Sequence, residues 1–108
     1  MVAAIAGADQ AVVTFYGHAE RQEFDAAYAL WSDRMRAQFP RRENLDERFD
    51  NTADIAILSL FVAEQSGAWA AVQIDFVETY DGGSSRRFIG WWEVILIDGR
   101  WVLDQPHF

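Results

Sequence analysis

The sequence predicts one α+β domain in which N-terminal helices pack in the concave face of a curved antiparallel sheet of about four strands. Apolar residues recur with a helical period up to about Asp54 and alternate in the manner of strands after it. Glycine-containing turn signals separate the alternating runs. The 108 residues, 51% of them hydrophobic, suit a single core. We therefore expect residues 1–108 to form one domain, with residues 1–8 as a flexible start.

The first half of the chain carries the helical pattern. Helices are predicted at residues 9–22, 24–31, 33–38 and 42–49. In the first of them, Phe15 and Tyr16 belong to an apolar stripe, and Asp9 is placed to cap the N-terminus. Few residues separate the first two helices, which predicts a helical hairpin. Pro40 ends the next helix, because proline disfavours helical backbone at the residue before it.

The second half carries the strand pattern. Strands are predicted at residues 55–64, 69–80, 86–97 and 100–104. Asp81-Gly82-Gly83-Ser84 predicts one hairpin turn, with Gly82-Gly83 as a two-residue loop, and Asp98-Gly99 predicts another. Pro106 is expected to close the last strand.

These turns fix an expected register. It places Glu78 opposite Arg87, Gln73 opposite Trp92 and Asp75 opposite Gly90. Residues Trp92, Val94, Leu96, Trp101 and Leu103 then share one face with Gln73, Asp75 and Val77. The other face carries Val72, Ile74, Phe76, Ile89, Trp91, Glu93, Ile95, Val102 and Asp104. A glycine inside a strand predicts a bulge at Gly90, and Glu93 is expected to face Asp104 as a like-charge pair.

Both faces of this sheet are apolar. A few short helices can cover one face, and an exposed apolar patch of that size promotes association. We therefore expect a homodimer formed through the outer face of the sheet.

Composition excludes several function classes. The formal net charge is −8, and all nine basic residues are arginine. Such a field repels phosphate backbones and anionic membranes, so we expect neither nucleic-acid binding nor membrane insertion. The chain has no cysteine and two histidines remote in sequence, which predicts no metal site, and no motif predicts a cofactor. The compartment stays open between cytoplasmic and extracytoplasmic.

Asp75 is the first candidate functional residue, since the expected register sets it beside Trp92 and Trp101. A carboxylate among aromatic rings would have a raised pKa and could act as a general base. The alternative is a hydrogen-bonded or edge-exposed aspartate. Gln73 is expected either to orient a ligand beside Asp75 or to satisfy a backbone group.

Tyr16 and His18 are the helix candidates. Tyr16 is expected either to direct its hydroxyl into a cavity or to lie in the core, and His18 to act as an acid or base or to face solvent. Trp31, Trp92 and Trp101 are the predicted aromatic lining of a site for a small apolar ligand, or else part of a filled core.

Two segments carry a resemblance to a known family. They are Phe15-Tyr16 followed by Glu23-Phe24-Asp25-Ala26-Ala27-Tyr28, and Gly90-Trp91-Trp92 followed by Asp98-Gly99-Arg100-Trp101-Val102-Leu103. With the order of elements, they resemble the nuclear transport factor 2-like superfamily, or cone fold, over nearly the whole chain. That resemblance implies the fold. The superfamily contains both enzymes and noncatalytic domains, so it leaves the activity open.

The catalytic members of the superfamily match poorly. In ketosteroid isomerases a tyrosine and a carboxylate act together, and their positions fall on Phe15 and Phe39, with Tyr16 one residue away. The Arg-x-Asp pair of epoxide hydrolase-like members has a counterpart only in Arg48-Phe49-Asp50, which we expect in a helix or loop. The resemblance thus favours a noncatalytic member.

The function predicted from the sequence is a noncatalytic module that binds a small ligand or a protein partner, or that dimerises. The extracytoplasmic part of a larger bacterial protein is one setting for it. The alternative is a small cone-fold enzyme of the isomerase, dehydratase or cyclase type, with Asp75 as general base acting on an apolar substrate.

Overall fold

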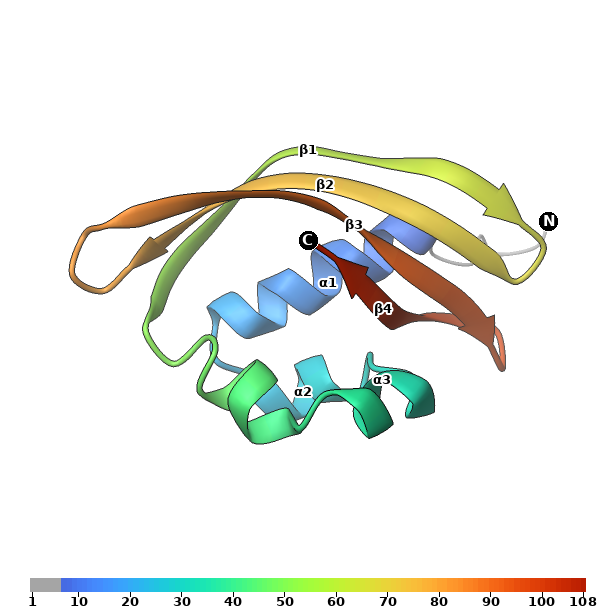
Figure 1. The fold of residues 1–108 in the computed structure, drawn as a ribbon, viewed down its shortest axis with the longest axis horizontal. Coiled ribbons are helices and arrows are strands. Elements are labelled where there is room, and N and C mark those ends of the chain that lie inside the picture. The colour runs from blue at the N-terminus through green and yellow to red at the C-terminus, as the bar shows by residue number, and fades with distance from the viewer. Residues whose placement is uncertain (1–6) are drawn as a thin grey trace, which may run out of the picture.

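The computed structural model describes residues 7–108, a helical first half followed by a four-stranded sheet (Figure 1). The elements are α1 (Ala8–Glu20), α2 (Phe24–Tyr28), α3 (Asp33–Gln38), the π-helical turn η1 (Arg42–Asp46), β1 (Thr52–Ser66), β2 (Trp69–Tyr80), β3 (Ser85–Ile97) and β4 (Arg100–His107). The strands pair antiparallel in the order β1-β2-β3-β4. The predicted fold class is confirmed.

The sheet curves over α1, and the short helices lie below α1 (Figure 1). Residues Val12, Phe15, Tyr16 and Ala19 of α1 are buried, as the helical stripe predicted. They pack with Val72, Ile74 and Phe76 of β2 in one hydrophobic core. Burial of this stripe against the sheet is what holds α1 in place.

The beginning of α1 differs from the prediction. Gly7 occupies the N-cap position, while Asp9 lies in the first helical turn and its Oδ1 accepts a hydrogen bond from the Gln10 amide at 3.0 Å. Ala8 is buried within the helix. The flexible start expected for residues 1–8 therefore does not extend to Ala8, and its first six residues lie outside the described part of the chain.

The helices are also tied to β4. Ser32 caps α3 by accepting a hydrogen bond from the Met35 amide, and its hydroxyl donates to Asp104 Oδ1 at 2.7 Å. Trp31 and Leu103 form a parallel β-bridge. The last strand is thus connected to both the sheet and the helical layer.

The predicted register between β2 and β3 is wrong by one residue. The loop has three residues, Asp81 to Gly83, with the Tyr80 amide donating to the Ser84 carbonyl oxygen at 2.8 Å, so that Thr79 pairs with Ser85 and Glu78 with Arg86. Side chains alternate between the two faces of a strand. The one-residue shift therefore puts each β2 side chain on the face opposite to that of its predicted β3 partner. Asp75 pairs with Ile89 rather than with Gly90.

The expected irregularity in β3 lies elsewhere. Gly90 pairs regularly with Ile74, and the bulge falls in β4 at Asp104, so that Glu93 faces Gln105 and avoids a like-charge pair. Pro106 does not end the strand. It pairs with Trp92, which is compatible with proline because β4 is an edge strand.

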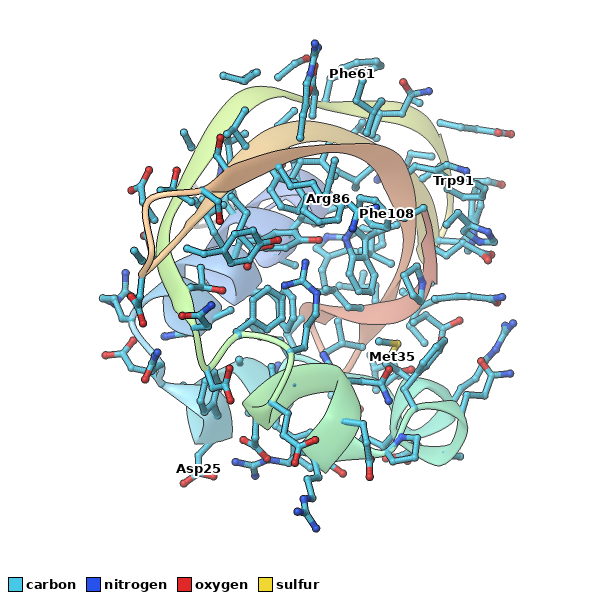
Figure 2. All side chains as sticks on the ribbon, turned by 60° about the vertical axis from the view of Figure 1, so that its left-hand side comes forward. Asp25, Met35, Phe61, Arg86, Trp91 and Phe108 are labelled. Carbon is cyan, nitrogen blue, oxygen red and sulfur yellow. The ribbon has the colours of Figure 1, made fainter. Side chains whose placement is uncertain are left out.

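The convex face of the sheet turns away from the helices. It carries Phe61 from β1, Gln73 and Asp75 from β2, and Arg87, Ile89 and Trp91 from β3. In Figure 2, Phe61 and Trp91 point outward from the curved sheet. Phe61 is 50% exposed and Ile89 is 66% exposed. The convex face therefore presents large apolar side chains to solvent.

Candidate functional site

A cavity of about 240 Å³ lies between the helices and the concave face of the sheet. Its lining is mostly aromatic: Phe15, Tyr16, Trp31, Met35, Phe39, Glu43, Asn44, Arg48, Phe49, Phe76, Phe88, Trp92, Pro106 and Phe108. In Figure 2, Met35 from the helical layer and Phe108 from beyond β4 lie in this interior region. An apolar wall with few polar groups is the usual composition of a small-molecule site.

The deep wall of the cavity contains a buried hydrogen bond between two aromatic side chains. The Trp92 indole Nε1–H donates to the Tyr16 hydroxyl oxygen at 3.1 Å. Burial raises the pKa of Tyr16 well above its ordinary value of 10, although the hydrogen bond from Trp92 and the charge of Arg48 act in the other direction. The hydroxyl therefore stays protonated, and no side chain among residues 7–108 accepts its proton.

Arg48 and Glu78 form an ion pair beside this wall. The Arg48 Nη1 and Nη2 donate to the two carboxylate oxygens of Glu78 at 2.9 and 2.8 Å. Glu78 is 0% exposed and also accepts a hydrogen bond from the Thr52 hydroxyl. Its carboxylate oxygens are thus occupied by donors, which holds it as a structural anion rather than as a free base.

The mouth of the cavity combines an aromatic ring with cationic groups. The Arg48 guanidinium carbon lies 4.4 Å from the Phe49 ring centroid and 5.2 Å from that of Phe88. The guanidinium carbon of Arg86 lies 5.1 Å from the same Phe88 ring. Glu43, the other charged residue of the lining, is exposed on η1. The distances from the Arg48 and Arg86 guanidinium carbons to the phenylalanine ring centroids are in the range of cation–π interactions.

The segment Pro106–Phe108 closes one side of the cavity. Phe108 lies edge-on to Phe76 and Trp92, with ring centroids at 6.2 and 6.1 Å. His107, between the two lining residues, turns outward: its Nε2 lies 2.7 Å from Glu93 Oε2 and its ring stacks on Trp91 at 3.9 Å. Contacts on the convex side of β3 thus hold a segment that lines the concave side.

Three of the residues that the sequence analysis selected line this cavity: Tyr16, Trp31 and Trp92. The Trp31 indole Nε1 is buried with no hydrogen-bond partner in the described part of the chain. Trp101 is buried too, but it borders a smaller hollow beside the first half of α1 rather than this cavity.

The other candidates are not in the cavity. The register shift puts Gln73 and Asp75 on the convex face, where Arg87 Nε donates to Asp75 Oδ1 at 2.9 Å. The hydrogen bond from Arg87 lowers the pKa of Asp75, although burial opposes it. The role of general base that the sequence suggested for Asp75 required a raised pKa. His18 lies near the end of α1, where its Nδ1 is 2.8 Å from Glu23 Oε1. The expected grouping of Asp75 with Tyr16 or His18 is therefore absent from this cavity.

Sequence reasoning missed most of the polar part of the site. In the sequence, Arg48 is recognisable only as half of an Arg-x-Asp pair, and Glu78 only as the expected cross-strand partner of Arg87. Correct pairing of β2 with β3 would have placed Glu78 on the concave face with Phe76 and Phe88. The aromatic residues at 76, 88 and 92 carry that signal once the register is known, since they alternate onto one face.

Other kinds of site have less support. Among residues 7–108, no group of three histidine or acidic side chains is arranged to hold a metal ion. Within the same residues, no helix has the length and apolar character that crossing a membrane requires.

Comparison with known proteins is informative for the fold. No protein-family model matches the chain, and no curated protein sequence matches it. Among solved structures, the chain is similar to the solution structure of a SEC-C motif-containing protein from Rhodopseudomonas palustris. The two share 15% sequence identity with a TM-score of 0.67, over 85% of this chain and 70% of that chain. At this identity the similarity establishes a common α+β fold with a bacterial protein.

Proposed function

We propose that this chain is a noncatalytic binding domain that takes a small aromatic ligand into the cavity between α1 and the concave face of the sheet. The observation that carries the proposal is the cavity itself, which is aromatic on most sides and has one buried hydroxyl, that of Tyr16, with a proton to donate. A ligand with an apolar ring and one acceptor group matches this lining.

The volume supports a ligand of about two rings. A cavity of about 150 Å³ accommodates benzene, and this one measures about 240 Å³. A naphthalene ring with one small substituent is a suitable probe.

The ionisable groups at the cavity support binding rather than catalysis. Glu78 is hydrogen-bonded by Arg48 and Thr52, and burial keeps Tyr16 protonated. Glu43 lies exposed at the rim. The rival function, an isomerase- or dehydratase-type enzyme with Asp75 as base, would need that carboxylate to act from the convex face.

Calorimetric titration with the neutral probe 2-naphthamide tests the proposal. We expect saturable one-to-one binding that Asn44→Trp, which fills the mouth of the cavity, abolishes. Phe61→Ala, on the convex face, is the matched control and should leave the affinity unchanged. Binding that ignores Asn44→Trp in a variant with a native circular dichroism spectrum, or no binding at all, would refute the proposal.

We further propose that the domain belongs to the nuclear transport factor 2-like superfamily. The helical hairpin, the curved sheet of four sequential antiparallel strands and the cavity between them support this membership. The ligand site proposed above then lies at the place where a cone-fold protein has its cavity.

The convex face is our proposed homodimer interface. Phe61 and Ile89 expose apolar surface there, and the Asp75–Arg87 ion pair lies among them. A two-fold interface needs a surface that complements itself, and an acid beside a base on an apolar face meets that need, because each can pair with its opposite on a second copy.

Native mass spectrometry and sedimentation test the dimer. Ile89→Asp should convert a dimer to a monomer, while Ile97→Asp, which alters an exposed isoleucine of the same face eight residues farther along β3, at the end of the strand, should not. A wild-type protein that remains monomeric at micromolar concentrations would contradict the interface.

A further inference from the structure

From the charges at the mouth of the cavity we infer that its ligand is an aromatic carboxylic acid, bound as the anion, with Arg86 and Arg48 holding the carboxylate. This inference rests on the proposed function, since it names the ligand class of the same cavity.

Arg86 is the cation available for a ligand. Its Cα partner across the sheet is Glu78, so it starts from the concave side of β3, and its guanidinium lies on Phe88 in the cavity wall. The carboxylate of Glu78 is already bound by Arg48. Among residues 7–108, no acidic side chain forms an ion pair with Arg86. A ligand carboxylate is the anion that this position lacks.

Arg48 adds directed hydrogen-bond donors. A guanidinium has five N–H groups, and Arg48 uses two of them on Glu78. Its contacts with the Phe49 and Phe88 rings fix the guanidinium plane at the cavity lining. The remaining N–H groups are therefore held in place at the mouth, where they can donate to an acceptor that enters with the ligand.

The charge balance favours an acid over an amine. Arg48 and Glu78 neutralise each other, which leaves Glu43 of the lining and Arg86, whose guanidinium lies on the lining ring of Phe88. Arg86 is held against the aromatic wall, whereas Glu43 is exposed at the rim of η1, where water weakens its influence. The net charge of −8 acts over long distances and is screened at physiological salt, so contacts at the mouth decide the preference.

The aromatic part of the ligand follows from the walls. Phe76 and Phe88 are stacked, with ring centroids 5.1 Å apart at 21°, and Phe108 and Trp92 present further rings. A flat ring can continue such a stack, and its carboxylate would then project toward the guanidinium groups on Phe88.

Three naphthalene probes of nearly equal size separate the possibilities: 2-naphthoate, 2-naphthamide and 2-naphthylmethylammonium. By calorimetry at pH 7.5 we expect the acid to bind at least about tenfold more tightly than the amide, equivalent to about 1.4 kcal/mol. The preference should shrink as salt is raised.

Two neighbouring arginines on β3 give a matched pair of variants. Arg86→Gln, on the concave side, should weaken binding of the acid far more than binding of the amide and so remove most of the preference for the acid. Arg87→Gln, on the convex face, should leave both affinities unchanged. Both side chains are exposed, so neither substitution disturbs the core.

The results distinguish this inference from the function on which it rests. Amide binding without preference for the acid, or preference for the ammonium probe, would overturn the inference and leave the binding function standing. An acid preference that survives Arg86→Gln would also overturn it. Failure of all three probes to bind would reject the cavity as a ligand site.

Discussion

Phe108 occupies the space that a side chain at position 90 would need. A Cβ atom on Gly90 would lie 2.5 Å from Phe108 Cδ2 and 2.5 Å from the His107 carbonyl oxygen. Glycine at this position lets the chain beyond β4 pass close to β3, and the Phe108 ring then reaches the cavity wall beside Trp92.

Gly90→Ala tests this close approach. We expect the variant to lose about 1–3 kcal/mol of unfolding free energy, the usual effect of overpacking, because backbone as well as ring must move. Urea denaturation measures the loss. Gly82→Ala is the control, since nothing lies within 4 Å of a Cβ there, and it should stay within about 0.5 kcal/mol of wild type. Equal effects at both glycines would contradict the packing role of Gly90.

Glu78→Gln tests the buried ion pair. The variant keeps the shape of the side chain but leaves Arg48 without its anion, and we expect a loss of about 3 kcal/mol, at the low end for a broken buried pair because Arg48 reaches solvent. Asp75→Asn, which removes the exposed pair with Arg87, should have little effect on the urea midpoint. A larger effect at Asp75 would show that the convex-face pair is the one that matters for stability.

Tyr16→Phe tests the buried hydroxyl. It leaves the Trp92 indole N–H without its acceptor, and the expected loss is about 1–3 kcal/mol of stability. Tyr28→Phe is the control, because the Tyr28 hydroxyl makes no hydrogen bond with the described residues, and it should change stability by less than about 0.5 kcal/mol. Binding of 2-naphthamide should also weaken in Tyr16→Phe alone. Unchanged affinity would assign the hydroxyl a purely structural role.

Glu93 is expected to contribute to acid sensitivity. In the folded protein its pKa lies below the ordinary 4.5, chiefly because His107 hydrogen-bonds the carboxylate, with burial opposing and Trp69 adding a second hydrogen bond. A lowered pKa in the folded state favours folding above the ordinary value, and that contribution is lost as the pH falls through the folded value.

The measurement is stability against pH for the wild type and Glu93→Gln. Wild-type stability should fall as the pH drops below about 4.5, and the Glu93→Gln curve should be flatter over that range. Glu64→Gln, which alters an exposed glutamate of β1, is the control and should follow the wild-type curve. Parallel curves for all three proteins would exclude Glu93 as a source of the acid sensitivity.

The fold could be predicted because it depends on the periodicity of apolar residues. The site could not be predicted, because it depends on the register in which β2 pairs with β3. The helical stripe through Phe15 and Tyr16 and the limits of β2 follow from the pattern of apolar residues. Asp81-Gly82-Gly83-Ser84, however, is compatible with either a two-residue loop, Gly82-Gly83, or a three-residue loop, Asp81 to Gly83, since two glycines relax the backbone throughout. One residue of difference exchanges Asp75 for Glu78 on the concave face.

The bulge at Asp104 shows a second limit. Sequence reasoning assigned the irregularity to Gly90, because glycine weakens a strand. The structure instead uses that glycine for close packing, and it bends β4 where Asp104 can reach Ser32 and Arg34. The Ser32–Asp104 hydrogen bond joins positions 72 residues apart in the chain, so no local sequence pattern can predict it.

The order of the strands has a consequence for how the protein folds. Each strand pairs with the next in the chain, so each hairpin can form by closing a short loop. Contacts between residues that are close in sequence favour fast folding. The cavity is different, because its walls bring Phe15 together with Phe108. Closing that long loop costs more chain entropy than closing a hairpin. We therefore expect the walls of the binding site to come together after the hairpins of the sheet have formed.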